Sequence, residues 1–359
     1  MAITAAMVKE LRELTGAGMM DCKKALNETD GNMDAAVEFL QKNGQAKALK
    51  KAGRIAAEGL CDVAVEGNNA AIVEVNSETD FVAKNEEFKT YVAAVAKQAL
   101  NSSASDIDAF SAESWNEDAS VTVQEALTAK IAKIGENLTI RRFKKISGDA
   151  VVSYVHGGGK IGVLVAAKNG NDDASKDALA NIAMQIAAMN PQYISEDDIS
   201  ADEKVKIEEI VRQNALSDPF SLPKPILNDL FDKAQAVWSD EDKAIFEEKK
   251  SNMNYLPNFL SNEAKAALVT LAQENQASIF ENKIFTNLLT GRINKQYKDI
   301  CLLDQVYVKA EDGKQSVAKY LESVNKDLVI TDMVRFETGE GLEKKEENFA
   351  EEVAKQMGQ

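Results

Sequence analysis

The stretch from Glu74 to Lys84, EVNSETDFVAK, marks the change of structure around which the chain is organised. The apolar run before it predicts a strand over 70–75 that enters a core, and apolar residues at helical spacing after it predict a helix over 86–100. The short polar turn between these elements ends in Phe81. A phenylalanine at such a place commonly packs against the first turn of its own helix, and the alternative is that Phe81 faces a partner. Chemistry alone leaves both interpretations open.

Composition places the chain among soluble, helix-rich proteins. Its 359 residues suffice for two or three domains with cores of their own, and a hydrophobic content of 45% with few aromatic residues favours helices. The net charge of −16 argues against nucleic acid as the main partner, because phosphate binding depends on clustered Lys and Arg. We expect a partner that is basic or of mixed charge.

Cysteine usage and hydropathy indicate where the protein works. Cys22, Cys61 and Cys301 are far apart in the sequence and form no CxxC pair, so neither a zinc site nor a disulfide framework is expected. The N-terminus has no apolar segment before a cleavage site, and no apolar run approaches the ~20 residues that span a bilayer. These features predict a cytoplasmic protein that does not associate with membranes.

Residues 1–54 predict a compact unit of three helices followed by a basic linker. Thr4 can cap the first helix, glycines separate it from the second, and we expect the third to close at Gly44. The linker carries four basic residues that would share one helical face, Lys47, Lys50, Lys51 and Arg54. Such a run is usually solvated, but in an acidic chain it could also dock an acidic surface.

Residues 55–147 predict a small antiparallel sheet with helices on one side. Strands over 60–66 and 70–76 form a hairpin around the turn Gly67-Asn68-Asn69. A further helix and a strand over 138–146 complete this half. Together these elements form the first half of a core.

The same pattern recurs in residues 148–190 and 300–338, which we interpret as a second, related half. Its hairpin surrounds the turn Gly157-Gly158-Gly159, and further strands are expected at 301–309 and 328–337. Two such halves make an α+β fold with helices on one side of each sheet. The second half has no phenylalanine at the turn that corresponds to the position of Phe81.

Two further segments complete the chain. Residues 191–299 hold all five prolines and form a long helical insertion with five candidate helices, at 201–216, 225–238, 240–250, 262–275 and 281–298. Residues 339–359 predict a C-terminal helical module in which Phe349 and Val353 lie on one apolar stripe. Such a helix caps its own core by default, and it can also lie against a partner.

The residues that could carry out chemistry do not combine into a reactive site. Glu74, Glu78 and Asp80 lack the His or Cys partners of a transition-metal site, and we expect them to be solvated. His156 is the only histidine and has no nucleophile motif beside it. The glycines at 157–159 lack the flanking residues of a phosphate-binding loop. The sequence therefore predicts no catalytic residue, metal site, cofactor or bound nucleotide.

Two stretches resemble the signatures of one family. EVNSETDFVAK at 74–84 and LRELTGAGMMDCKKAL at 11–26 are similar to those of the elongation factor Ts family, the guanine-nucleotide exchange factors of elongation factor Tu. The resemblance implies that residues 1–54 fold like a ubiquitin-associated domain. It also implies a projecting helical hairpin within 191–299, although the insertion of this chain is much longer.

The resemblance implies a function as well. It implies a protein that is not an enzyme, needs no cofactor, and binds elongation factor Tu in its GDP-bound and nucleotide-free states to promote GDP release. It favours a partner-facing Phe81 that enters an apolar crevice of the GTPase. The contact residues that it implies are Lys23, Lys51, Thr79, Asp80, Phe81, Val82, Ile134, Gly135, His156, Phe349 and Val353. Residues 191–299 could also mediate self-association.

Two other classes of function are considered. The unit at 1–54 could serve an adaptor that binds ubiquitin-like or ribosomal surfaces without any exchange activity. A hydrolase centred on His156 is the other class, and the missing nucleophile motif counts against it.

Overall fold

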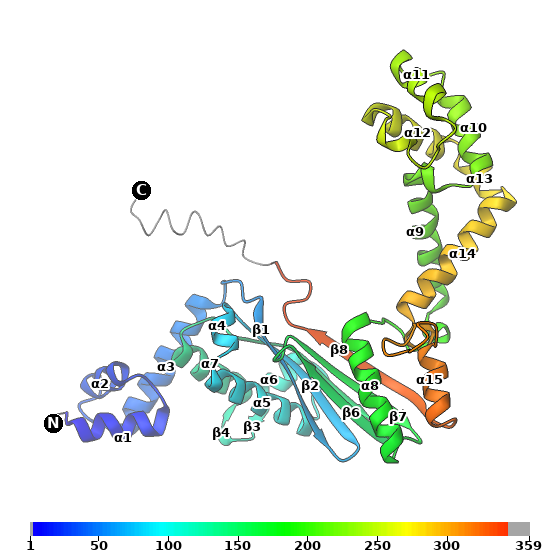
Figure 1. Cartoon of the computed structure of the whole chain (residues 1–359). Helices are drawn as coiled ribbons and strands as arrows, with labels where there is room; N and C mark the ends of the chain where they lie inside the picture. The colour runs from blue at the N-terminus through cyan, green and yellow to red at the C-terminus, as the bar shows by residue number, and fades with distance from the viewer. Residues whose placement is uncertain (1–2, 344–359) are drawn as a thin grey trace. The chain divides into compact units, whose positions relative to one another are not determined.

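The computed structural model describes residues 3–343. The chain divides into two compact units, of which the first comprises Met1–Asn190 with Lys319–Gln359 and the second comprises Pro191–Ala318. The first unit contains the N-terminal helices and two three-stranded sheets, and the second is built of helices (Figure 1). The C-terminal helix expected to carry Phe349 and Val353 lies outside the described residues.

Three helices form the N-terminal part of the first unit: α1 (Ala5–Thr15), α2 (Met19–Glu28) and α3 (Met33–Lys51). The Thr4 hydroxyl accepts a hydrogen bond from a backbone N–H in the first turn of α1, and Gly16 ends this helix with φ of 66°. Such a left-handed conformation is readily adopted by glycine. Leu11, Cys22 and Leu26 are buried where the helices meet. The predicted three-helix unit is therefore present.

The expected end of the third helix at Gly44, and the linker after it, are wrong because α3 continues to Lys51. Gly44 is buried against the helix α7 (Val123–Ile134), and a Cβ atom on it would lie 3.6 Å from the Cβ of Ala132. Packing on α7 thus outweighs the ~1 kcal/mol that a glycine costs inside a helix. The basic residues up to Lys51 belong to this packed helix.

The first half of the core is a three-stranded antiparallel sheet, in the order β1-β2-β5, with helices on one face. Its elements are β1 (Glu58–Glu66), β2 (Asn69–Ser77), α4 (Asp80–Ala83), α5 (Glu86–Asn101), α6 (Ile107–Ala112), β3 (Ser114–Trp115), β4 (Asp118–Thr122), α7 and β5 (Thr139–Ser147). Val73 and Val75 of β2 pack with Phe88 of α5, because alternate side chains of a strand share a face. The hairpin and helix predicted around EVNSETDFVAK are confirmed.

The second half repeats this plan. Its elements are β6 (Ala150–His156), β7 (Ile161–Lys168), α8 (Asp173–Met189), α15 (Val317–Val324) and β8 (Val329–Glu337). The sheet order is β6-β7-β8, all antiparallel, and α8 packs on β6 and β7 as α5 packs on β1 and β2. An α+β fold with two related halves is therefore confirmed.

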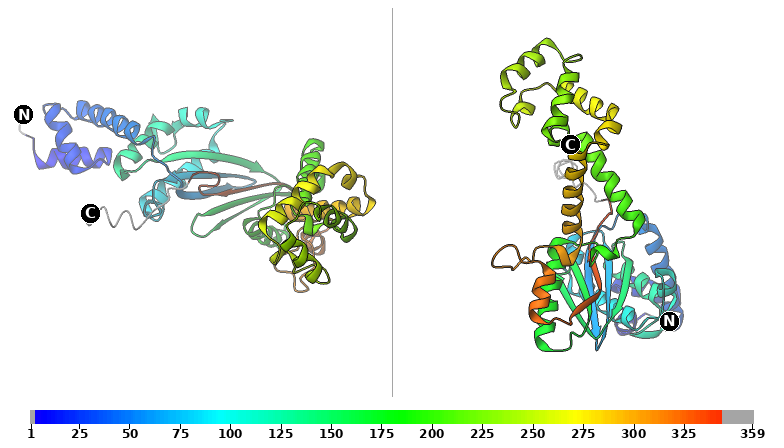
Figure 2. Two further views of the ribbon diagram at one scale, coloured as in Figure 1. Left: turned by 90° about the horizontal axis from the view of Figure 1, so that it is seen from above. Right: turned by 90° about the vertical axis from the view of Figure 1, so that its right-hand side faces the viewer.

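The two sheets pack face to face, so a shared core lies between them and the helices lie outside (Figures 1 and 2). Ile72, Leu164 and Phe336 help to fill this core. A Cβ atom on Gly162 would lie only 2.9 Å from Cδ1 of Ile72, so glycine is needed for this close approach of the sheets. The backbone N–H of Cys61 in β1 also donates to the carbonyl of Gly159, 2.7 Å away.

The second unit has a hydrophobic core of its own, to which Phe231, Trp238 and Phe285 contribute. Its main helices are α9 (Ala201–Ser217), α10 (Lys224–Ala234), α11 (Asp240–Lys249), α12 (Asn262–Glu274), α13 (Gln276–Phe280) and α14 (Lys283–Ile300). The expected strand at 301–309 is wrong. Leu302–Asp304 instead forms a turn of 3-10 helix, closed by a bond from the Asp304 N–H to the Cys301 carbonyl.

Candidate partner-binding site

Phe81 projects from α4, a single helical turn between β2 and α5. Its side chain is 80% exposed, whereas Ala83 is buried and Val82 packs against the core of the first half. The hydroxyl of Thr79 caps α4 by accepting from the Val82 N–H at 3.4 Å. The structure therefore excludes the interpretation in which Phe81 packs back onto its own helix.

Asp80, next to Phe81, forms an exposed ion pair with Lys84, whose Nζ lies 2.6 Å from Oδ2. The hydrogen bond from Lys84 is the main reason that the pKa of Asp80 lies below its ordinary value, and the charge of Lys160 acts in the same direction. Lys160 follows the glycine turn of the second half.

The loop that leads into α4 is fixed by a carboxylate from another loop. One oxygen of Glu136 accepts from the backbone N–H groups of Glu78 and Thr79, at 3.1 and 3.0 Å, and the other accepts from the Thr79 hydroxyl at 2.7 Å. In return, the Glu78 carboxylate accepts from the N–H of Asn137 at 2.6 Å. The Asn137 side chain donates to the carbonyl of Arg54 at 2.9 Å. We call these five residues the loop junction.

Ile134, Gly135 and Lys51 lie beside the loop junction. Gly135 ends α7 with φ of 91°, and a Cβ atom on it would lie 3.8 Å from Nζ of Lys51. Ile134 packs partly into the core of the first half. Three of the expected contact segments, which are the end of α3, the start of α4 and the end of α7, thus meet in one place.

His156 is exposed at the end of β6, and its Nδ1 lies 2.9 Å from the hydroxyl of Tyr154. The following glycines all have positive φ, and a Cβ atom on Gly159 would lie 2.6 Å from Cδ2 of Leu60. Leu60 belongs to the same hydrophobic cluster as Val82 and Ala83 of α4. The turn after His156 is therefore connected to the Phe81 loop through β1.

Other expected contact residues are not part of this assembly. Lys23 lies exposed on a different element, α2, in the N-terminal three-helix unit. Phe349 and Val353 lie outside the described residues. Glu136 and Asn137 were not identified from the sequence, although they directly follow Ile134-Gly135. A sequence does not show which backbone groups a carboxylate in a polar loop will bind.

The expectation that Glu74 is solvated is wrong, because its side chain is fully buried. It lies on the face of β2 that meets the other sheet, where its oxygens accept from Arg141 at 3.0 Å, Arg142 at 2.5 Å and the Gly339 N–H at 2.8 Å. Burial acts to raise the pKa of Glu74, but the bonds from Gly339, Arg141 and Asn76 and the charge of Arg142 hold it below its ordinary value.

The Glu74 network also ties the two halves together. Arg141 donates to the carbonyl of Glu340 at 2.6 Å, and Arg142 donates to the carbonyl of Glu337 at 3.2 Å. The guanidinium of Arg142 lies over the ring of Phe336, 4.2 Å from its centroid. Charged side chains of β2 and β5 thus bind backbone groups at and just after the end of β8, which holds the two sheets in one arrangement.

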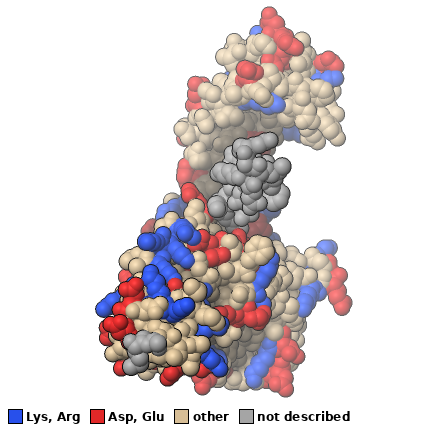
Figure 3. Space-filling view, turned by 90° about the vertical axis from the view of Figure 1, so that its left-hand side faces the viewer, with Lys and Arg blue, Asp and Glu red and all other residues tan. Residues whose placement is uncertain are grey.

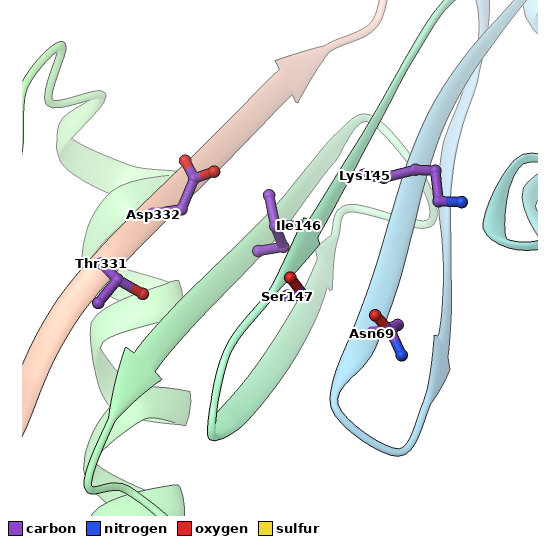
Figure 4. Close-up of a pocket in the computed structure, with 6 residues that line it drawn as sticks. All are labelled: Asn69, Lys145, Ile146, Ser147, Thr331 and Asp332. Atoms are coloured by element: carbon purple, nitrogen blue, oxygen red, sulfur yellow. The ribbon is translucent and has the colours of Figure 1, made fainter. Parts of the chain in front are cut away.

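Cavities of the described chain include two that lie away from Phe81 and His156. One, of about 350 Å³, lies between β5 and β8 and is lined by Asn69, Lys145, Ile146, Ser147, Thr331 and Asp332 (Figure 4). Its lysine is already bound to the carbonyl of Ser102, at 2.5 Å. The other, of about 450 Å³, lies between the N-terminal helices and α7. Phe81 and His156 line neither of these two cavities, and both are exposed.

Residues 3–343 contain no group of three or more His, Cys, Asp or Glu side chains placed to hold a metal ion. All three cysteines are buried, and burial raises the pKa of Cys61 to about 12 and that of Cys301 to about 11.

Basic side chains gather on the face shown in Figure 3, despite the net charge of −16. No helix among the described residues is long and apolar enough to cross a membrane.

Phe81 is thus an exposed aromatic side chain on a loop whose backbone is fixed by hydrogen bonds. Comparison with known proteins specifies the class. A family described as "Elongation factor TS" matches residues 78–340. Elongation factor Ts from Clostridioides difficile is 43% identical over 361 residues, and the proteins of that name from Clostridium tetani and Clostridium perfringens are 42% and 43% identical over 364 and 368 residues.

Each of these alignments covers 99% of both chains. The chain therefore belongs to the elongation factor Ts family, a family of translation elongation factors. These alignments include the long helical insertion. The insertion is therefore part of the length that this chain shares with these relatives.

Proposed function

We propose that this chain is a guanine-nucleotide exchange factor that binds elongation factor Tu and promotes release of its GDP. The observation that carries the proposal is the exposure of Phe81 on a loop whose backbone is fixed by Glu136. An apolar side chain held outside its own core is suited to insert into a crevice of a partner. Membership of the elongation factor Ts family supports elongation factor Tu as that partner.

Thermodynamic linkage explains how such an insertion would release GDP. If the chain binds the nucleotide-free GTPase more tightly than the GDP form, it must weaken GDP binding by the same factor. Burial of a phenylalanine side chain contributes about 1.5–3 kcal/mol. Only the part of this free energy that is lost in the GDP-bound state contributes to exchange.

The residues around Phe81 have supporting roles in this proposal. Asp80 and Thr79 orient the loop, and Val82 anchors it to the core of the first half. His156 makes a second contact from the other half of the core. Ile134, Gly135, Lys51 and Lys23 add to the contact area, as do Phe349 and Val353, and residues 191–299 are available for self-association. We place this activity in the cytoplasm, where translation elongation takes place.

The test is the release of fluorescent GDP from elongation factor Tu into an excess of unlabelled GDP. The chain is added in substoichiometric amounts, and the same mixture without the chain gives the intrinsic rate. We expect acceleration with turnover, so that one chain acts on many GTPase molecules. A folded chain that leaves the release rate of its cognate GTPase unchanged would refute the proposal.

A second candidate function is an adaptor that binds through the N-terminal helices. The observation in its favour is the exposure of Leu14, Met19 and Met20, at 69%, 59% and 74%, in this unit. The full chain carrying Met19→Ser and Met20→Ser separates the two functions. An adaptor would lose capture of a ubiquitin-like or ribosomal partner while any GDP release stayed at the wild-type rate.

A further inference from the structure

We propose that Glu136 is a positioning residue for nucleotide exchange, because its carboxylate sets the backbone from which Phe81 projects. The inference rests on the proposed exchange function and assigns a role to a residue that makes no expected contact with the GTPase. Glu136 acts through the loop before α4, and the loop junction is the physical connection.

The contacts of Glu136 are concentrated on one short piece of backbone. Two consecutive N–H groups, of Glu78 and Thr79, and the Thr79 hydroxyl all donate to its two oxygens within 3.1 Å. Hydrogen bonds to an ionised carboxylate are about twice as strong as those between neutral groups. Thr79 is also the N-cap of α4. Glu136 therefore holds the residue at which the Phe81 helix begins.

This anchoring is needed because α4 has little stability of its own. It comprises four residues, whereas isolated helices shorter than ~12–15 residues are marginal in water. Phe81 gains little from packing within the chain, since 80% of its side chain is exposed. Without the Glu136 carboxylate, the loop would become ordered only on binding the partner. The entropy lost in that step would weaken binding.

The loop junction is reciprocal, which fixes the distance between three segments. Glu136 binds the backbone of the loop that contains Glu78, and Glu78 binds the backbone of the loop that contains Glu136, through Asn137. Asn137 and Glu78 also bind Arg54, just beyond α3. The three segments joined in this way carry the expected contacts at Lys51, Phe81 and Gly135. A partner would thus meet them in one preset arrangement.

The primary test is Glu136→Gln in the full chain. The substitution keeps the size of the side chain, but it removes the charge and places an NH₂ group among donors. We expect faster hydrogen exchange of the Glu78 and Thr79 amides and a loss of GDP-release activity of about tenfold, with a nearly unchanged melting temperature. Glu136→Asp, which retains the charge on a shorter side chain, should give a smaller loss in the same direction.

Glu113→Gln is the matched control. The Glu113 carboxylate also joins separate segments, since it accepts from the Ser102 hydroxyl at 2.8 Å and the Ser103 N–H at 3.3 Å, but it does not contact the loop before α4. We expect this variant to release GDP at the wild-type rate. If both variants lost the same GDP-release activity, then loss of any carboxylate that links two segments would have this effect. That result would overturn the specific role of Glu136.

A double-mutant cycle with Phe81→Ala distinguishes positioning from general stability. If Glu136 acts through Phe81, then adding Glu136→Gln to Phe81→Ala causes no further loss of GDP release. Independent losses that multiply would overturn the inference, and so would unchanged exchange of the Glu78 and Thr79 amides in Glu136→Gln. A wild-type chain that fails to accelerate GDP release would refute the proposed function instead, because the amide measurement needs no GTPase.

Discussion

The two halves of the core share an architecture but differ in the connection between the middle strand and the helix that follows it. In the first half this connection carries the extra turn α4, which exposes Phe81. In the second half it is the short segment 169–172, in which Gly170 is buried and Asp172 caps α8. The first connection presents a side chain to the outside, whereas the second packs within its own half.

Both connections are nevertheless anchored in a similar way. The N–H of Asn169 donates to a carboxylate oxygen of Asp149 at 3.1 Å, as the N–H groups of Glu78 and Thr79 donate to Glu136. A carboxylate that fixes a loop is therefore not what distinguishes the halves. The difference lies in what the fixed loop carries, and only the loop of the first half carries an exposed aromatic side chain.

The largest expected effect concerns the buried contacts of the Glu74 carboxylate that connect the two halves, which we call the joint. Glu74→Gln leaves Arg141 and Arg142 without their buried counter-charge, and breaking a buried ion pair from one side costs about 3–5 kcal/mol. We expect that loss in the free energy of unfolding measured with urea. Glu340→Gln is the control, since Glu340 pairs with Arg142 at an exposed position and should cost less than about 1 kcal/mol. Equal effects of the two variants would contradict a buried joint.

A smaller effect is expected where the second half packs on the first. Gly159→Ala imposes a left-handed conformation on alanine, at about 1–2 kcal/mol, and also pushes a Cβ atom to 2.6 Å from Leu60. Gly158→Ala imposes similar strain with no atom within 4 Å of the new Cβ. Urea unfolding should therefore show the greater loss for Gly159→Ala. If Gly158→Ala costs as much, the contact between the halves at this turn is not tight.

The joint should also make stability depend on pH. The pKa of Glu74 is lowered in the folded chain, so its contribution is fully present above the ordinary value of about 4.3. That contribution is lost as the pH falls through the lower, folded-state pKa. We expect the free energy of unfolding to fall on acidification below about pH 4.3, and to fall less in Glu74→Gln. Identical pH dependence in the two proteins would exclude this contribution.

Local patterns predicted the fold well where neighbouring residues decide the structure. Both hairpins followed from glycine-containing turns between apolar runs, and α5 and α8 followed from helical spacing. Gly44 misled the prediction for α3 because the stabilising contact comes from Ala132 of α7, which is far away in the sequence. The apolar run at 301–309 has the composition of a strand, but it forms a 3-10 turn and isolated bridges.

The candidate site shows the same limit. An aromatic residue in a polar turn drew attention to Phe81, but chemistry alone left its role open. The resemblance to the family favoured a partner-facing side chain, and its exposure required the structure. The burial of Glu74 was unpredictable, since its partners Arg141, Arg142 and Gly339 come from two other strand regions. Glu136 gave no signal because it binds backbone groups, whose positions the sequence does not specify. Pairings between distant segments are thus what the sequence left undetermined.

Parallel measurement of GDP release with Phe81→Ala, His156→Ala and Phe259→Ala chains tests the difference between the halves most directly. Phe259 lies in the second unit with half of its side chain exposed, so its variant controls for the loss of an exposed phenyl ring. Phe81→Ala removes the free energy gained when this side chain is buried in the GTPase, and it should lower the GDP-release rate by about tenfold to 100-fold. His156→Ala should lower it only a few-fold, and Phe259→Ala should not change it. A folded Phe81→Ala chain with wild-type activity, or a greater loss in His156→Ala, would contradict the central role of the first half.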